Sequence, residues 1–205
     1  MDWKDKHLWP RILAIKGAVI FLVFTSVAAA HYPGYSFWHN YLSDLGKERA
    51  SAPFFNIGVI LTGITMLALF GILAARKSPV SLRVPVVAAC IASIGLVGVG
   101  VYPSTMPLEH TISALSFFAF MGAAVILFSK AYWEEGSRGL ALFGAAAFAV
   151  DMLSITQSST DLGPGLQKVA VAMLLVFTLL FVHCLPQRFN PSQPREEKPC
   201  GTMGE

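Results

Sequence analysis

The feature that most constrains this chain is a series of six long apolar stretches separated by short polar segments. Each stretch has about 18 residues or more, which is enough for an α-helix to cross a bilayer. Backbone groups in lipid must be hydrogen-bonded within the protein, and an α-helix satisfies them locally. We therefore expect an all-α membrane protein, a bundle of six transmembrane helices over residues 12–30, 54–75, 84–102, 111–132, 139–157 and 167–185.

The composition agrees with this interpretation, since 55% of the residues are hydrophobic and only 13% are charged. The loops are short, so residues 1–187 should form one membrane domain. Residues 188–205 are rich in proline and charge, and we expect a disordered cytoplasmic tail there. The fifth stretch has many small residues, which predicts a central position in the bundle.

The positive charges predict how the chain lies in the membrane. Three of the 15 lysines and arginines fall on one side, namely Lys47, Arg49 and Lys168, and the other twelve fall on the opposite side. This asymmetry predicts a multi-pass protein of the cell membrane with both termini cytoplasmic and residues 31–53 facing outward. The net charge of +3 is explained by these residues and gives no case for nucleic-acid binding.

A cleavable signal peptide is an alternative interpretation of the N-terminal region. Basic residues precede an apolar run that ends in Ala28-Ala29-Ala30, a pattern typical of a cleavage site. Cleavage would remove the first span and would leave residues 31–53 on the same side.

The polar segment HYPGYSFWHNYLSDLG, residues 31–46, carries most of the candidate chemistry. From Ser36 its spacing predicts a short amphipathic helix at the membrane interface, between the first two spans. One face is apolar and the other polar, and Gly46 is placed to end the helix. The apolar face holds Trp38, Tyr41, Leu42 and Leu45, and the polar face holds His39, Asn40, Ser43 and Asp44.

Two further polar positions fall within or beside the spans. His110 begins the fourth span, with Ser113 one helical turn later. Asp151 lies inside the fifth span, with Ser154 on the same face. A carboxylate within the bilayer costs a few kcal/mol, so it usually faces a partner or a wet cavity. An interhelical hydrogen bond is the structural alternative for Asp151.

Together these residues predict an outward-facing polar pocket. Its candidate catalytic residues are His39, Asp44, His110 and Asp151, and its candidate binding residues are Asn40, Ser43, Ser113 and Ser154. Two histidines with one or two carboxylates would also suit zinc. No HxxxH or HExxH spacing is present, however, so we expect no cofactor and keep zinc only as an alternative.

Two motifs resemble an uncharacterised family of six-span prokaryotic membrane proteins, the domain of unknown function nine-nine-eight. The first is HYPGYSFWHNYLSDLG, similar to the family's HPGYSxxxNYxSDLG, and the second is YPSTMPLEHTISA. The resemblance covers about residues 10–187 and implies signature positions at Asn40, Ser43, Asp44, Gly46 and His110. It implies no activity. A more distant likeness to FRAG/DRAM/Sfk-type six-span proteins would favour a lipid-facing role.

Three functions fit these observations. The first is an outer-leaflet protein that binds or modifies lipid, in which the histidines act as general acid and base and the carboxylates orient them. The second is a small proton-coupled transporter with Asp151 as the relay. The third is a non-catalytic scaffold or sensor. The expected partners are membrane lipids; the sequence leaves open whether the protein is an enzyme and whether it forms a homo-oligomer.

Overall fold

The computed structural model describes residues 3–76 and 80–185. The predicted tail, residues 188–205, lies outside the described residues. The elements are α1 (Trp3–Ala30), the 3₁₀ helix η1 (Leu42–Gly46), α2 (Ala52–Ala74), α3 (Val80–Val101), α4 (Pro107–Glu134), α5 (Arg138–Thr156) and α6 (Gly163–Cys184).

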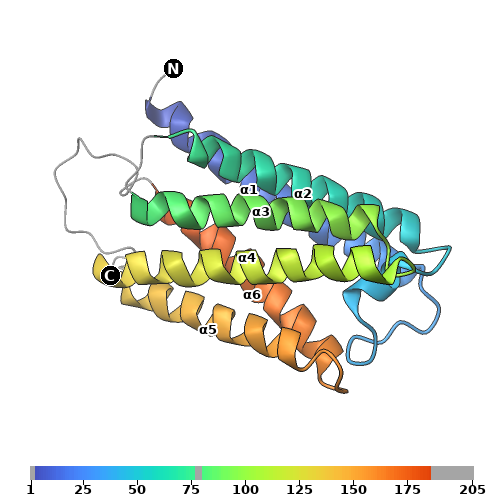
Figure 1. Cartoon of the computed structure of the whole chain (residues 1–205). Coiled ribbons are helices and arrows are strands. Elements are labelled where there is room, and N and C mark those ends of the chain that lie inside the picture. Colours follow the sequence, from blue (N-terminus) through green and yellow to red (C-terminus); the bar gives the residue numbers. More distant parts are fainter. Residues whose placement is uncertain (1–2, 77–79, 186–205) are drawn as a thin grey trace, which may run out of the picture.

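All regular structure in the described residues is helical, and each of the six α-helices contains an apolar segment long enough to cross a membrane. This confirms the prediction of a six-helix integral membrane bundle. Successive helices run in opposite directions, so α1 begins and α6 ends at the same end of the bundle (Figure 1). We call the opposite end, which carries η1, the η1 end.

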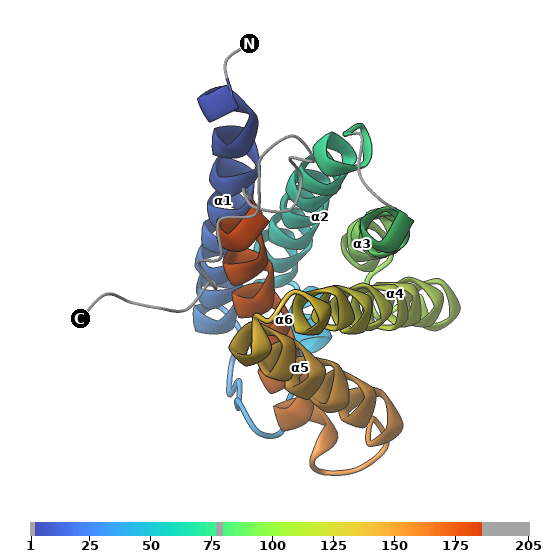
Figure 2. The ribbon, with the colours of Figure 1, turned by 90° about the vertical axis from the view of Figure 1, so that its left-hand side faces the viewer.

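The helices pack in chain order, and α6 returns to meet α1, which closes the ring (Figure 2). The predicted central position of the fifth helix is wrong. α5 lies at the edge and packs chiefly on α4 and α6. Only 28% of its apolar segment is buried, against 44% for α6. Its small residues allow close contact with these two helices and do not place α5 at the centre of the bundle.

Glycines bring neighbouring helices close together. A Cβ on Gly63 of α2 would lie 2.9 Å from the backbone nitrogen of Val97 in α3, and one on Gly95 of α3 would lie 2.7 Å from that of Phe117 in α4. Gly58 of α2 lies against the side chain of Phe24 in α1, where a Cβ would overlap the Cβ of Phe24. Because lipid supplies no hydrophobic force between helices, such close backbone contact is what holds them together.

A short helix lies between α1 and α2, as predicted, but it is shorter and of another type. Ser36 to Asn40 form turns, Tyr41 is extended (φ −69°, ψ 157°), and only Leu42–Gly46 is helical, as a 3₁₀ helix. Gly46 does not have the positive φ of a helix-ending glycine. A Cβ there would instead lie 2.6 Å from Oδ1 of Asn56, so the glycine lets η1 pack against α2.

The glycine contacts make a testable prediction about stability. Gly95→Ala should destabilise the protein by about 1–3 kcal/mol, because the added methyl group overpacks a contact between two backbones. Gly71→Ala is the matched control, since Gly71 lies on an exposed helix face and a Cβ there meets nothing within 4 Å. Thermal unfolding of both variants in one detergent compares them. Equal unfolding temperatures would contradict the close α3–α4 packing.

Candidate functional site

A central cavity lies inside the ring of helices. It is lined by residues of α1, α2, α3, α4, α6 and η1, and α5 contributes none. The volume open to the centre of a water-sized molecule is about 90 Å³. Its walls are mostly aliphatic and aromatic, with Val59, Leu96, Phe117, Phe118 and Leu174 among them. A cavity of this composition suits a hydrocarbon ligand.

The cavity is long along the bundle axis. Its lining runs from Phe55 to Met66 on α2, from His110 to Met121 on α4 and from Gln167 to Thr178 on α6. Each run covers twelve residues, and the eleven steps between its ends give a length of about 16 Å at about 1.5 Å per residue. One leaflet of a bilayer contributes about 15 Å of hydrocarbon, half of the ~30 Å core. The cavity is therefore about as deep as one lipid chain is long in its leaflet.

Two threonines within this length add little polarity. The hydroxyl groups of Thr62 and Thr178 each donate to a carbonyl of their own helix, on Gly58 and Leu174, at 2.8 Å. Because both hydroxyl hydrogens are already bonded, neither group requires a polar ligand. The middle and the deep end of the cavity are therefore effectively apolar.

The η1 end of the cavity carries three polar side chains, which we call the polar mouth: Ser43, His110 and Gln167. Nδ1 of His110 lies 2.8 Å from the carbonyl oxygen of Tyr102, so this nitrogen donates and Nε2 is left as an acceptor. Oε1 of Gln167 accepts from the backbone nitrogen of Leu42 at 3.0 Å, which leaves the amide hydrogens to donate. The mouth thus offers both donors and acceptors without a fixed charge of its own.

The segment from His31 to Gly46, which we call the strap, crosses the η1 end beside this mouth, and Lys168 of α6 holds it. Lys168 is 6% exposed. Its Nζ donates to the carbonyl oxygens of Phe37, at 2.6 Å, and of Asn40, and to that of Pro164 in its own helix, at 3.1 Å. The ammonium also lies 5.0 Å and 5.6 Å from the ring centroids of Phe37 and Tyr35. Charge-assisted hydrogen bonds of this kind are strong.

Further contacts tie the strap to the start of α6 and the loop before it. The hydroxyl of Tyr41 donates to the carbonyl oxygen of Ser158. The ring of Trp38 covers Gly165, where a Cβ would lie 2.7 Å from a ring carbon. On the other side, Oγ of Ser104 donates to the carbonyl oxygen of Ser43 at 3.2 Å. The strap is therefore held by groups distant from it in the sequence.

Comparison with known proteins finds one family. The model of the family described as "Protein of unknown function (DUF998)" matches residues 15–186. The chain belongs to this family. The match includes the strap, the polar mouth and every residue that lines the cavity. Neither the curated proteins nor the solved structures contain a match to the chain.

Membership in this family confirms the resemblance that the two motifs indicated. The signature positions lie in the strap and the mouth. Ser43 and His110 line the cavity, whereas Asn40, Asp44 and Gly46 shape the strap. Oδ1 of Asn40 accepts from the backbone nitrogen of Ser36 at 2.8 Å, and Oδ2 of Asp44 accepts from that of Tyr41 at 2.7 Å. The signature therefore combines two mouth residues with residues that fold the segment beside them.

The structure does not bring the four candidate catalytic residues together. His39 is exposed, and Asp44 is occupied by Tyr41 and by Lys47, whose Nζ lies 2.7 Å from Oδ1. His110 lies at the mouth. Asp151 is fully buried on α5 against Gly122 of α4, away from the cavity lining. The turns at Ser36–Asn40 move His39 outward, and the rotation of α5 turns Asp151 toward α4.

Of the candidate binding residues, only Ser43 reaches the cavity. The side chain of Asn40 bonds within the strap. Ser113 is buried in the α3–α4 contact beside Gly98, and Ser154 donates to the carbonyl oxygen of Asp151 at 2.8 Å. The sequence analysis missed Gln167 entirely and treated Lys168 only as a topological charge. The expected span began at residue 167, whereas α6 begins at Gly163, so both residues lie one turn inside the helix, where polar residues usually have partners.

The zinc alternative has no support in the arrangement of side chains. Among residues 8–76 and 81–185, whose side chains the structure describes, no group of three or more His, Cys, Asp or Glu side chains could hold a metal ion. Catalytic zinc sites need three protein ligands. We therefore carry the site forward as a ligand cavity with a polar mouth.

The strap makes a prediction about alkaline stability. Burial, and secondarily the charge of Asp44, raises the pKa of Tyr35 from 10.0 to about 12. The folded strap thus favours the neutral phenol, and its contribution to stability is complete below pH 10 and lost as the pH rises through about 12. We expect the unfolding temperature to fall more steeply over this range than that of a Tyr35→Phe variant. Parallel pH profiles would contradict the burial of this phenol.

Proposed function

We propose that this integral membrane protein binds one hydrocarbon chain of a membrane lipid in the central cavity, with the polar end of that lipid at the mouth. The proposal rests on the match between the length of the cavity and the length of a lipid chain in one leaflet. An apolar space about as deep as one leaflet ends in three hydrogen-bonding side chains, Ser43, His110 and Gln167. The narrow volume of about 90 Å³ favours one chain over two.

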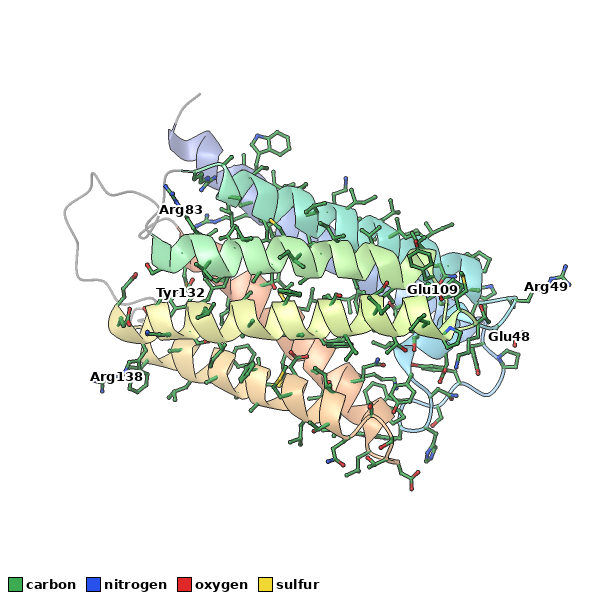
Figure 3. All side chains as sticks on the ribbon, viewed as in Figure 1. Glu48, Arg49, Arg83, Glu109, Tyr132 and Arg138 are labelled. Carbon is green, nitrogen blue, oxygen red and sulfur yellow. The ribbon has the colours of Figure 1, made fainter. Side chains whose placement is uncertain are left out.

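The surroundings of the mouth favour a ligand held by hydrogen bonds. Glu48, Arg49 and Glu109 are exposed, Arg49 projects from the η1 end (Figure 3), and none of the three lines the cavity. Lys168 is nearby, but its ammonium is directed to three carbonyl oxygens and does not line the cavity. The proposal is limited to binding: Nδ1 of His110 donates to a backbone carbonyl, and the other groups of the mouth are hydroxyl and amide side chains.

The test is photo-crosslinking in lipid nanodiscs with a monoacylglycerol that carries a diazirine near the end of its chain. In the unmodified protein, labels should appear on the deep lining residues of α2, α4 and α6, such as Met66, Met121 and Thr178. Ala114→Phe should lower this labelling by about tenfold or more, since a ring in the cavity overpacks it and about 1.4 kcal/mol is a factor of ten.

Ala119→Phe is the matched control, because it makes the same change on the exposed face of the same helix. It should leave the deep labels unchanged. Thermal unfolding of both variants shows that they fold. Equal labelling of the unmodified protein and the two folded variants would overturn the proposal and favour a scaffold role.

A second candidate function, proton transfer by Asp151, is favoured by one specific observation. The side chain is fully buried, and neither carboxyl oxygen has a hydrogen-bond partner. A carrier predicts proton flux in liposomes that Asp151→Asn abolishes and that Asp161→Asn, at an exposed position, does not. The absence of flux with the unmodified protein would exclude a carrier. Asp151 would then be a neutral packing residue of the α4–α5 contact.

A further inference from the structure

The ring of helices is weakest where α1 meets α6. Near the chain termini the two helices are joined, since Nη2 of Arg11 donates to the carbonyl oxygen of His183 at 3.2 Å. From there they diverge toward the η1 end, and the strap lies across the space between them (Figures 1 and 2). Among the described glycines, none brings α1 against α6.

The cavity lies directly behind this divergence. Phe21 of α1 and Val171 and Leu175 of α6 line it, and all three side chains are only half-buried. The other walls are built from closely packed α2, α3 and α4. The thinnest wall of the cavity is therefore the one between α1 and α6, where it faces the surrounding lipid.

The strap has the features of a segment that closes the gap between α1 and α6. It continues directly from the end of α1 at Ala30, and its far part is bonded to the start of α6 through Lys168 and Gln167. Phe37 and Trp38 are 49% and 63% exposed, and aromatic side chains of this kind favour the membrane interface. The strap thus joins the two helices that diverge.

We infer that the bound lipid exchanges laterally with the bilayer between α1 and α6, and that the strap, held by Lys168, controls this exchange. The inference rests on the proposed lipid binding and adds the route and the controlling residue. Two of the three carbonyls that bind the Lys168 ammonium belong to the strap. Lifting the strap leaves a buried ammonium with one partner, so the closed arrangement is favoured at rest.

Lys168→Met tests the inference, because it keeps the apolar stem and removes the donors. Protein in nanodiscs is first equilibrated with the diazirine monoacylglycerol in the dark. It is then mixed with an excess of vesicles that lack this probe, and samples are crosslinked by a flash of light at successive times. The loss of deep labels measures release of the lipid. We expect release from the Lys168→Met variant to be about tenfold faster or more, the factor that one lost charge-assisted hydrogen bond predicts.

Two further variants keep the test decisive. Lys47→Met removes an exposed lysine that pairs with Asp44 and does not bond α6, and it should release lipid at the unmodified rate. Tyr41→Phe removes a single bond to the loop before α6 and should accelerate release less than Lys168→Met. If the Lys168→Met variant does not fold, the release rate of the Tyr41→Phe variant provides the test instead.

The outcomes separate the two proposals. Deep labels that decay at one rate in all folded variants would overturn the control of lateral exchange by the strap and leave lipid binding intact. Deep labels that are absent from the unmodified protein would overturn lipid binding and the role of the strap together.

Discussion

Close backbone contact at glycines is the constraint on which the rest of this structure depends. In a membrane the solvent is itself apolar, so apolar side chains gain nothing by leaving it. Helices therefore associate where their backbones can approach closely and make van der Waals contacts. Gly63 and Gly95 bring the backbones of α2, α3 and α4 together, and Gly58 and Gly122 let side chains of α1 and α5 pack closely on α2 and α4. No described glycine does so between α1 and α6, and it is there that the helices diverge. The cavity and its thin wall both follow from this asymmetry.

The strap completes the ring by a different kind of interaction. Its backbone carbonyls at Phe37 and Asn40 bind an ammonium that lies 131 and 128 residues away in the sequence. The turns at Ser36–Asn40 do not continue as an α-helix, because Tyr41 is extended and its backbone nitrogen donates to Oδ2 of Asp44. A buried lysine without such partners would be costly, so the strap and Lys168 stabilise each other.

Part of the candidate site could be predicted from the sequence. Ser43 and His110 were identified because polar residues in the two sequence motifs stood beside apolar spans, and both line the cavity. His39 and Asp44 were grouped with them by a helical phase that the strap does not adopt. Asp151 was recognised as a buried carboxylate, but its direction depends on how α5 is rotated against α4. Gln167 was not identified, and Lys168 was assigned no contact, because their partners lie in a segment remote in the sequence.

The sequence by itself determined that this chain is a six-helix membrane protein, because the length and apolarity of each span are local properties and lipid permits little else. It also determined that polar groups gather at one end. Only the tertiary structure decided which of these groups face a common cavity, that the fifth helix lies at the edge, and that Lys168 holds the strap. These features depend on helix rotation and on contacts between distant residues, which no local pattern specifies.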